Sequence, residues 1–160
     1  MLMTQIDIPA EARQPLGAAL NLHLSQAIDL MLQSKQAHWN VKGPHFIALH
    51  ELFDKLAEEA EEWVDSLAER AVALGGVAEG TLPVVAQRTR LPAYPLALSD
   101  GLAHVSALAT TLAAFGRAIR GAIDEADRLG DAGTADLFTA IVRSADKYLW
   151  FLEAHLQGGR

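Results

Sequence analysis

Five side chains of metal-binding type recur at helical spacings in the first half of the chain. They are two histidines and three carboxylates, in the order His38, His50, Asp54, Asp65 and Glu69. Imidazole nitrogen and carboxylate oxygen together suit iron, manganese or zinc. Because the chain has no cysteine, disulfides, thiolate metal sites and cysteine nucleophiles are excluded. These residues therefore predict a metal centre built from His, Asp and Glu.

The spacing predicts that four of these ligands share one face of one helix. His50 and Asp54 are four positions apart, and so are Asp65 and Glu69, which is the spacing of helix neighbours. Asp54 and Asp65 are 11 positions apart, or about three turns. Both pairs then point the same way, but they are separated by roughly 16 Å along the helix axis. Metal–ligand distances are about 2 Å, so one chain cannot close this site.

A second copy of the helix, antiparallel across a twofold axis, can close it. The axis would pass near residues 59–60, so that His50 and Asp54 of one chain face Asp65 and Glu69 of the other. Such a self-complementary contact creates two identical sites. His38, near the end of the preceding helix, is expected to lie beside His50. The spacing thus predicts a metal site shared between two subunits.

The elements that position these ligands are long helices separated by glycine and proline. Pro15 opens a run of apolar residues at helical spacing that ends before Gly43. Further helices are expected at about 45–74, at about 100–129 behind a Ser99 cap, and at about 135–156 behind a Thr134 cap. Residues 77–98 hold three prolines and predict a long connection with at most a short helix.

This order predicts an all-α fold: a ferritin-like four-helix bundle with a long crossover between helices two and three. We expect residues 1–14 to form a short mobile tail and residues 15–157 to form the bundle. The in-bundle Glu-x-x-His signature of ordinary di-iron ferritins is absent from the sequence. On pattern alone, a spectrin-like or other bundle without metal remains an alternative.

Charge and composition narrow the function classes. The chain has 160 residues, 51% of them hydrophobic, and a net charge of −7. A net negative charge attracts cations and repels the phosphate groups of DNA, so strong direct binding to DNA is not expected. The first 15 residues contain no lysine, and the C-terminal extension is only residues 157–160. With no signal-peptide pattern and no long apolar run, we expect a cytoplasmic protein without a membrane partner.

Two stretches resemble the Dps family, mini-ferritins first described as DNA-binding proteins from starved cells. They are SKQAHWNVKGPHFIALHELFDKLAEEAEEWVDSLAERAVALGGVAEG and the last helix, TADLFTAIVRSADKYLWFLEAHL. The pattern His-x₁₁-His-x₃-Asp-x₁₀-Asp-x₃-Glu matches the family's ferroxidase centre without a gap. The resemblance implies a hollow homododecamer with iron sites at twofold interfaces. It also implies oxidation of Fe(II), commonly by hydrogen peroxide, and storage of ferric mineral.

The resemblance also implies roles for residues around the five ligands. Trp39, beside His38, would lie at the centre and take up oxidising equivalents, although helix packing is the simpler role. Asp127, Asp131 and Asp136 would line an acidic threefold pore for Fe(II); ordinary helix capping is the alternative. Separately, Glu58 and Glu61 lie close to the ligand stripe, which predicts that they face the twofold contact or a mineral-nucleating cavity wall. Glu59 is expected on a solvated face.

The function expected is a ferroxidase and iron store that protects against oxidative stress. A nucleoid protein that compacts DNA is the alternative from another class, and the lysine-poor tails oppose it. A third possibility is a structural cage with a zinc-occupied, inactive centre, because the same ligands accept zinc. The residues do not distinguish O₂ from hydrogen peroxide as the oxidant.

Overall fold

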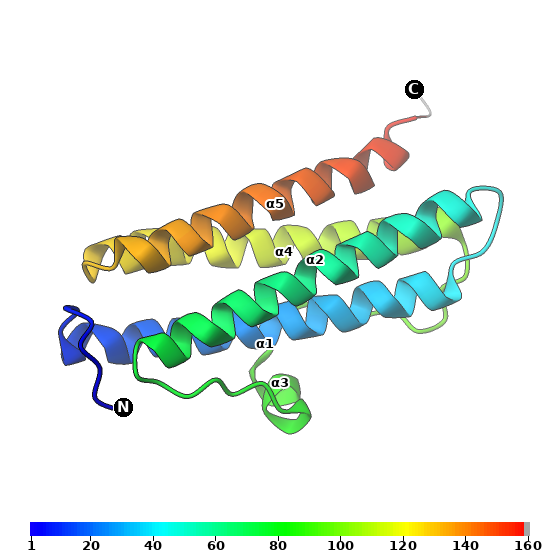
Figure 1. Ribbon diagram of the computed structural model, residues 1–160. Coiled ribbons are helices and arrows are strands. Elements are labelled where there is room, and N and C mark those ends of the chain that lie inside the picture. Colours follow the sequence, from blue (N-terminus) through cyan, green and yellow to red (C-terminus); the bar gives the residue numbers. More distant parts are fainter. Residues whose placement is uncertain (159–160) are drawn as a thin grey trace.

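The computed structural model describes residues 1–158, and their regular secondary structure is helical. The four long helices are α1 (Ala10–Asn40), α2 (Phe46–Ala73), α4 (Gly101–Arg128) and α5 (Ala132–Leu156). A short helix, α3 (Leu82–Arg88), interrupts the connection between α2 and α4. Figure 1 shows the long helices side by side as a bundle, with α3 outside it. Within residues 1–158 there is no β-strand, only an isolated bridge between Lys42 and Asp100. The expected all-α bundle with one long crossover is confirmed.

The bundle is built from two helical hairpins. α1 packs chiefly against α2, and α4 against α5. The turn of each hairpin lies at an opposite end of the bundle (Figure 1). Phe53, Phe115 and Phe138, from α2, α4 and α5, are completely buried between the hairpins. Burial of a phenylalanine side chain contributes about 2 kcal/mol, so these rings hold the hairpins together and fix the faces that α1 and α2 present.

The first helix begins earlier than Pro15 predicts. α1 starts at Ala10, after Pro9, and Pro15 lies inside it. The carbonyl of Pro9 accepts hydrogen bonds from two amides of the first turn, so Pro9 supplies the helix start. Residues 10–14, expected within a tail, therefore belong to the bundle. The amide of Leu2 donates to the carbonyl of Gly75 at 2.7 Å, which brings the start of the chain to the end of α2.

Two helix caps also differ from expectation. α4 is capped by Asp100 rather than Ser99, and α5 by Asp131 rather than Thr134. In each case the carboxylate accepts a hydrogen bond from the amide three residues on, which satisfies a donor that the helix leaves free. A carboxylate also interacts favourably with the positive end of the helix dipole. Thr134 is instead the third residue of α5.

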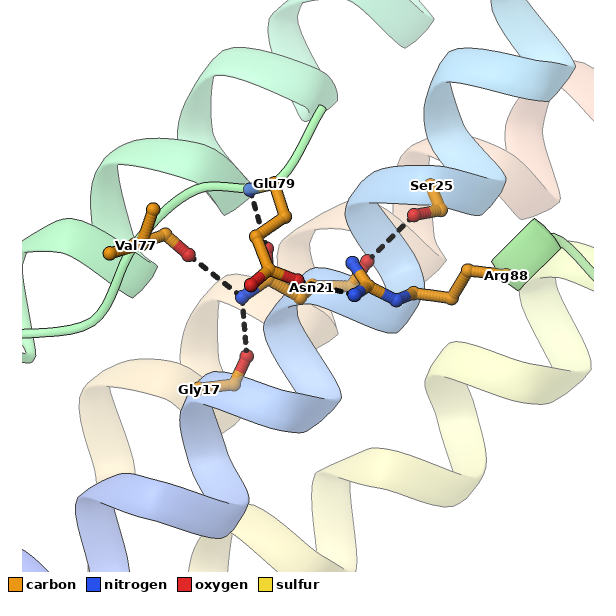
Figure 2. Close-up of polar contacts among 6 residues, drawn as sticks. All are labelled: Gly17, Asn21, Ser25, Val77, Glu79 and Arg88. Carbon is orange, nitrogen blue, oxygen red and sulfur yellow. Dashed lines mark hydrogen bonds and ion pairs between the residues drawn. The ribbon is translucent and has the colours of Figure 1, made fainter. Parts of the chain in front are cut away.

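The crossover begins against the side of α1, where Asn21 holds it. The side-chain amide of Asn21 donates to the carbonyls of Val77, at 2.9 Å, and Gly17, at 3.1 Å. Its oxygen accepts from the amide of Glu79 at 2.9 Å. Figure 2 shows these bonds, together with the ion pair between Glu79 and Arg88 of α3. One side chain of α1 thus fixes the first residues of the crossover.

Among the described residues, α4 alone is long and apolar enough to cross a membrane by length and composition. Half of its most apolar window is buried against the rest of the bundle. The core helix of a bundle passes the same test, so this feature is weak evidence for a membrane span. Gly159 and Arg160, part of the expected C-terminal extension, lie outside the described residues.

Candidate metal centre

His38 and His50 lie against each other where α1 and α2 meet. His38 is in the last turn of α1 and His50 is in the second turn of α2. Their rings are stacked, with centroids 3.7 Å apart and planes inclined by 21°. The ring of Phe46 packs beside His50 at 5.0 Å. The structure places His38 beside His50, as the sequence predicted.

Backbone contacts set which ring nitrogen carries the proton. Nδ1 of His38 bonds to the carbonyl oxygen of His50 at 2.9 Å, and Nδ1 of His50 bonds to the carbonyl oxygen of His38 at 2.8 Å. A carbonyl oxygen only accepts, so both Nδ1 atoms must be donors. In the neutral rings, each Nε2 then keeps its lone pair. Histidines that bind metals are oriented in this way.

Asp54 lies beside His38 on the same side of the hairpin. It lies one turn after His50 in α2, and its Oδ1 is 3.8 Å from Nδ1 of His38. The same oxygen accepts a hydrogen bond from the ammonium group of Lys35. This hydrogen bond, helped by the charges of Lys35 and the two imidazoles, lowers the pKa of Asp54 below its usual range despite partial desolvation. Asp54 is therefore an anion at neutral pH, which is the form that binds metal.

Asp65 and Glu69 do not join this cluster within one chain. Both are exposed on the later turns of α2. Within residues 1–158, no three His, Asp or Glu side chains stand close enough together to hold one ion. The structure thus forms only part of a metal site. His38 stacks on His50 and has Asp54 beside it, an arrangement that we call the half-site, and the other two carboxylates are exposed.

The residues predicted around the ligands lie mostly at the surface. Trp39 is 66% exposed, so packing within its own chain does not account for it. Glu58 and Glu61 are exposed on α2. Glu59, expected on a solvated face, is half-buried and accepts a hydrogen bond from Ser144 of α5. That expectation for Glu59 was wrong, because α5 packs closely enough to take this side chain as a partner.

The three aspartates predicted for a pore have different surroundings. Asp127 and Asp136 are exposed at the α4–α5 turn. The side chain of Asp131 is 2% exposed and forms an ion pair with Arg70 of α2, 2.6 Å between Oδ1 and Nη2. It also accepts from the amide and hydroxyl of Thr134. Burial alone would raise the pKa of Asp131, but these hydrogen bonds and the charge of Arg70 outweigh burial and lower it. Asp131 thus ties α2 to α5 and is not free to line a pore.

Two features near the half-site were missed by sequence reasoning. Lys35 lies three positions before His38 in α1, a spacing that puts both side chains on one face, so its contact with Asp54 could have been anticipated. The second is a buried hydrogen bond between Tyr94 of the crossover and His104 of α4. No periodicity or motif signals that contact.

Comparison with known proteins agrees with the fold. Residues 17–160 match the ferritin-like domain family. The chain is 47% identical over 154 residues to the DNA protection during starvation protein of Agrobacterium fabrum, covering 96% of this chain and 95% of that protein. Among solved structures, it resembles DpsA14 from Streptomyces coelicolor, with 36% identity, a TM-score of 0.92, and coverage of 98% and 92% of the two chains. It also resembles Dps from Mycobacterium smegmatis, with 31% identity, a TM-score of 0.90, and coverage of 98% of this chain and 96% of that chain.

These matches define a ferritin-like protein. More narrowly, the chain belongs to the Dps family. Membership in that family supports an iron-storage function of the ferritin type and protection against oxidative damage.

Proposed function

We propose that this protein is a ferroxidase that oxidises Fe(II) at sites shared between two subunits and stores the ferric product inside a hollow dodecamer. The observation that carries the proposal is the half-site. His38 and His50 hold their Nδ1 protons on backbone carbonyls, and Asp54 is held as an anion beside them. These are nitrogen and oxygen ligands suited to iron, with the tautomer already selected.

The missing ligands come from a second copy of α2 in this proposal. Asp65 and Glu69 lie on the same helix as His50 and Asp54, and they are exposed. A twofold contact between two α2 helices would bring them to the partner's half-site and would form two sites at once. Trp39, exposed beside His38, would then lie near the bound iron and take up oxidising equivalents. Because Trp39 is exposed in the single chain, it is available to be buried at a twofold contact.

Iron is the substrate, and the residues act by binding and orienting it. Each Fe(II) gives up one electron, and a molecule of hydrogen peroxide accepts two as its O–O bond breaks. O₂ is the other possible oxidant. The carboxylates favour the more highly charged ferric product through electrostatics. Zinc fits the same ligands and would compete with iron while leaving the site without redox chemistry.

Exposed acidic residues are proposed to guide iron through the shell. Asp127 and Asp136, repeated around a threefold axis, would focus a field that attracts cations. Glu58 and Glu61, exposed on α2, would face the twofold contact or a cavity wall where mineral nucleates. In a protein that handles reduced iron, the proposed location is the cytoplasm.

DNA compaction is the alternative function, and the charge distribution opposes it. The chain carries 13 basic and 20 acidic residues, and a shell of negative subunits repels duplex phosphate. We expect no retention of duplex DNA in a gel-shift assay at physiological salt. Tight retention that weakens steeply as salt rises would instead support the DNA-compacting function.

One chromatographic experiment tests cage, oxidation and storage together. The protein is loaded anaerobically with Fe(II), treated with hydrogen peroxide, and passed over a size-exclusion column while protein and ferric absorbance are recorded. Twelve chains of 17.2 kDa give about 206 kDa, and we expect ferric absorbance to elute at that size. A large shell without ferric absorbance would indicate an inactive or zinc-blocked centre. A small species without iron would contradict the proposal.

A further inference from the structure

A hydrogen-bonded tyrosine–histidine pair joins the crossover to α4. Tyr94 lies in the crossover between α3 and α4, and His104 lies in the first turns of α4. The phenolic oxygen of Tyr94 is 2.5 Å from Nδ1 of His104, and the ring centroids are 6.0 Å apart. Tyr94 is half-buried, whereas His104 is 1% exposed. This is the pair that we call Tyr94–His104 below.

Burial fixes the protonation state of both partners. It lowers the pKa of His104, so the imidazole is neutral at pH 7, and it raises the pKa of Tyr94, so the phenol keeps its proton. The phenol therefore donates its hydrogen bond to the lone pair on Nδ1. A neutral base is held in direct contact with the proton of a phenol that does not ionise by itself.

Burial disfavours a positive charge on His104, and its polar neighbours partly offset that effect. The backbone carbonyls of Leu98 and Asn40 and the carboxylate of Asp100 all act to raise its pKa, against the larger effect of burial. Within the described residues, Nε2 of His104 is buried and has no hydrogen-bond partner. An unpaired buried polar atom costs about 1–3 kcal/mol, and an apolar ring would avoid that cost.

The pair lies next to the residues that hold the proposed metal. The ring centroid of Phe53, which precedes Asp54 in α2, is 6.3 Å from that of His104. Asn40, whose carbonyl acts on His104, follows His38 by two residues. His104 thus contacts residues of α1 and α2 that lie within two positions of His38 and Asp54 along the chain.

We propose that Tyr94 is a one-electron donor that quenches strong oxidants formed at the half-site, with His104 accepting its proton. The oxidant rests on the proposed function. Two bound Fe(II) ions supply both electrons that hydrogen peroxide accepts, but where only one Fe(II) is bound, the O–O bond breaks with one electron and gives Fe(III), hydroxide and a hydroxyl radical. Tyr94 gives one electron to the radical, which becomes hydroxide. The phenolic O–H bond breaks, its proton passes to Nδ1, and a phenoxyl radical and an imidazolium remain. A further Fe(II) ion returns the electron, and the proton returns to the phenol.

The second tyrosine of the chain is a matched control. Tyr148 is buried on α5, and its hydroxyl makes no hydrogen bond among residues 1–158. Burial and the charges of Glu59 and Glu58 raise the pKa of Tyr148, but neither carboxylate is bonded to the hydroxyl. Tyr148 therefore has no bonded base, and we expect it to be oxidised much more slowly than Tyr94.

The first test uses metal-free protein and photogenerated tris(bipyridine)ruthenium(III) as the one-electron oxidant. Ring-deuterated tyrosine identifies tyrosyl radicals by rapid-freeze EPR. We expect the signal in the wild-type protein and in Tyr148→Phe, and its loss in Tyr94→Phe. His104→Gln keeps a hydrogen-bond acceptor but cannot take the proton, so radical formation should slow about a hundredfold. A signal that depends on Tyr148, or an unchanged rate in His104→Gln, would overturn the proposal.

A second measurement needs no variant. Because the phenolic proton moves with the electron, oxidation of Tyr94 in the wild-type protein should be slower in D₂O than in H₂O. Equal rates in the two solvents would overturn the role of His104 even if a variant failed to fold.

The third arm separates this proposal from the proposed function. Fe(II) and hydrogen peroxide replace the ruthenium oxidant, and ferric absorbance is recorded beside the EPR spectrum. Ferric product without a Tyr94 signal would overturn quenching by Tyr94 and leave the ferroxidase standing. Absence of ferric product would contradict the ferroxidase, while the ruthenium experiment would still decide whether Tyr94 and His104 form a redox pair.

Discussion

His38 and His50 are joined by a reciprocal pair of hydrogen bonds, each Nδ1 to the other's backbone carbonyl. This arrangement links the end of α1 to the start of α2 and selects the tautomer with a free Nε2 on both rings. Secondary structure and metal chemistry are coupled here, because the contacts that close the hairpin also prepare its ligands.

Lys35 is predicted to weaken metal binding by competing for Asp54. Its ammonium group bonds the carboxylate oxygen that a metal would use. In Lys35→Met, we expect Zn(II) to bind about fivefold more tightly, equivalent to an ion pair of roughly 1 kcal/mol at a half-exposed site. Isothermal titration calorimetry measures the affinity. Lys55→Met removes an exposed lysine beside Asp54 and serves as the control. Equal or weaker binding in Lys35→Met would contradict the competition.

The contacts of Asp131 predict an acid-sensitive contribution to stability. Because the pKa of Asp131 is lowered in the folded protein, its stabilisation is complete above the unfolded pKa, about 3.9. It is lost as the pH falls through the folded pKa. At pH 7, Asp131→Ala should cost about 2 kcal/mol for the lost cap and ion pair.

Thermal unfolding at a fixed protein concentration measures this effect. The difference in melting temperature between wild type and Asp131→Ala should shrink below about pH 4, where the unfolded chain begins to bind a proton at this carboxylate, and should vanish below the lowered pKa of the folded protein. Asp127→Ala, at an exposed position, should melt close to the wild type throughout. A difference that stays constant from pH 7 to strongly acidic conditions would exclude the ionised carboxylate as its source.

Asn21 is predicted to anchor the crossover. Asn21→Ala leaves the carbonyl of Val77 and the amide of Glu79 without their partner, and should cost about 1–2 kcal/mol. Hydrogen exchange at the Glu79 amide should accelerate. Asn40→Ala, also in α1, removes one local bond to Gln36 and should cost less than about 0.5 kcal/mol. Comparable losses in the two variants would mean that the crossover is held elsewhere.

Asp136 is predicted to speed the arrival of Fe(II). It is exposed beside the α4–α5 turn, and its charge would be repeated around the proposed pore. Asp136→Asn should slow Fe(II) uptake at low salt, and the difference from wild type should fall as salt screens the field. Stopped-flow ferric absorbance gives the rate. An unchanged rate at low salt would remove Asp136 from the route of iron.

Sequence reasoning predicted the four helices and the crossover because periodicity and Gly or Pro breaks are local signals. The helix starts were harder to predict. Pro9 precedes α1 although Pro15 is equally compatible with a first turn, and Asp131 caps α5 although Thr134 is also a capping residue. In such cases two local solutions compete, and contacts with the rest of the fold decide between them. For Asp131, the deciding contact is Arg70, which is 61 positions away.

In the site, too, the features that follow from local spacing could be predicted, and those that depend on tertiary contacts could not. The shared face of His50 and Asp54 follows from their spacing, and the position of His38 follows from the antiparallel hairpin. The hydrogen bond between Tyr94 and His104 depends on how an irregular segment returns to α4. Irregular segments carry no periodicity, so the sequence holds no signal for that contact.

The measurement that tests the shared metal site most directly is metal binding by a hybrid of two inactive chains. His50→Ala/Asp54→Ala and Asp65→Ala/Glu69→Ala chains are coexpressed with different tags, and assemblies holding both are isolated. Zn(II) binding is then compared with that of each variant alone. A pair of unlike chains should contain one intact site, so tight binding should return in the hybrid and be absent from both parents. No recovery in the hybrid, or tight binding by either parent, would contradict a site built from two subunits.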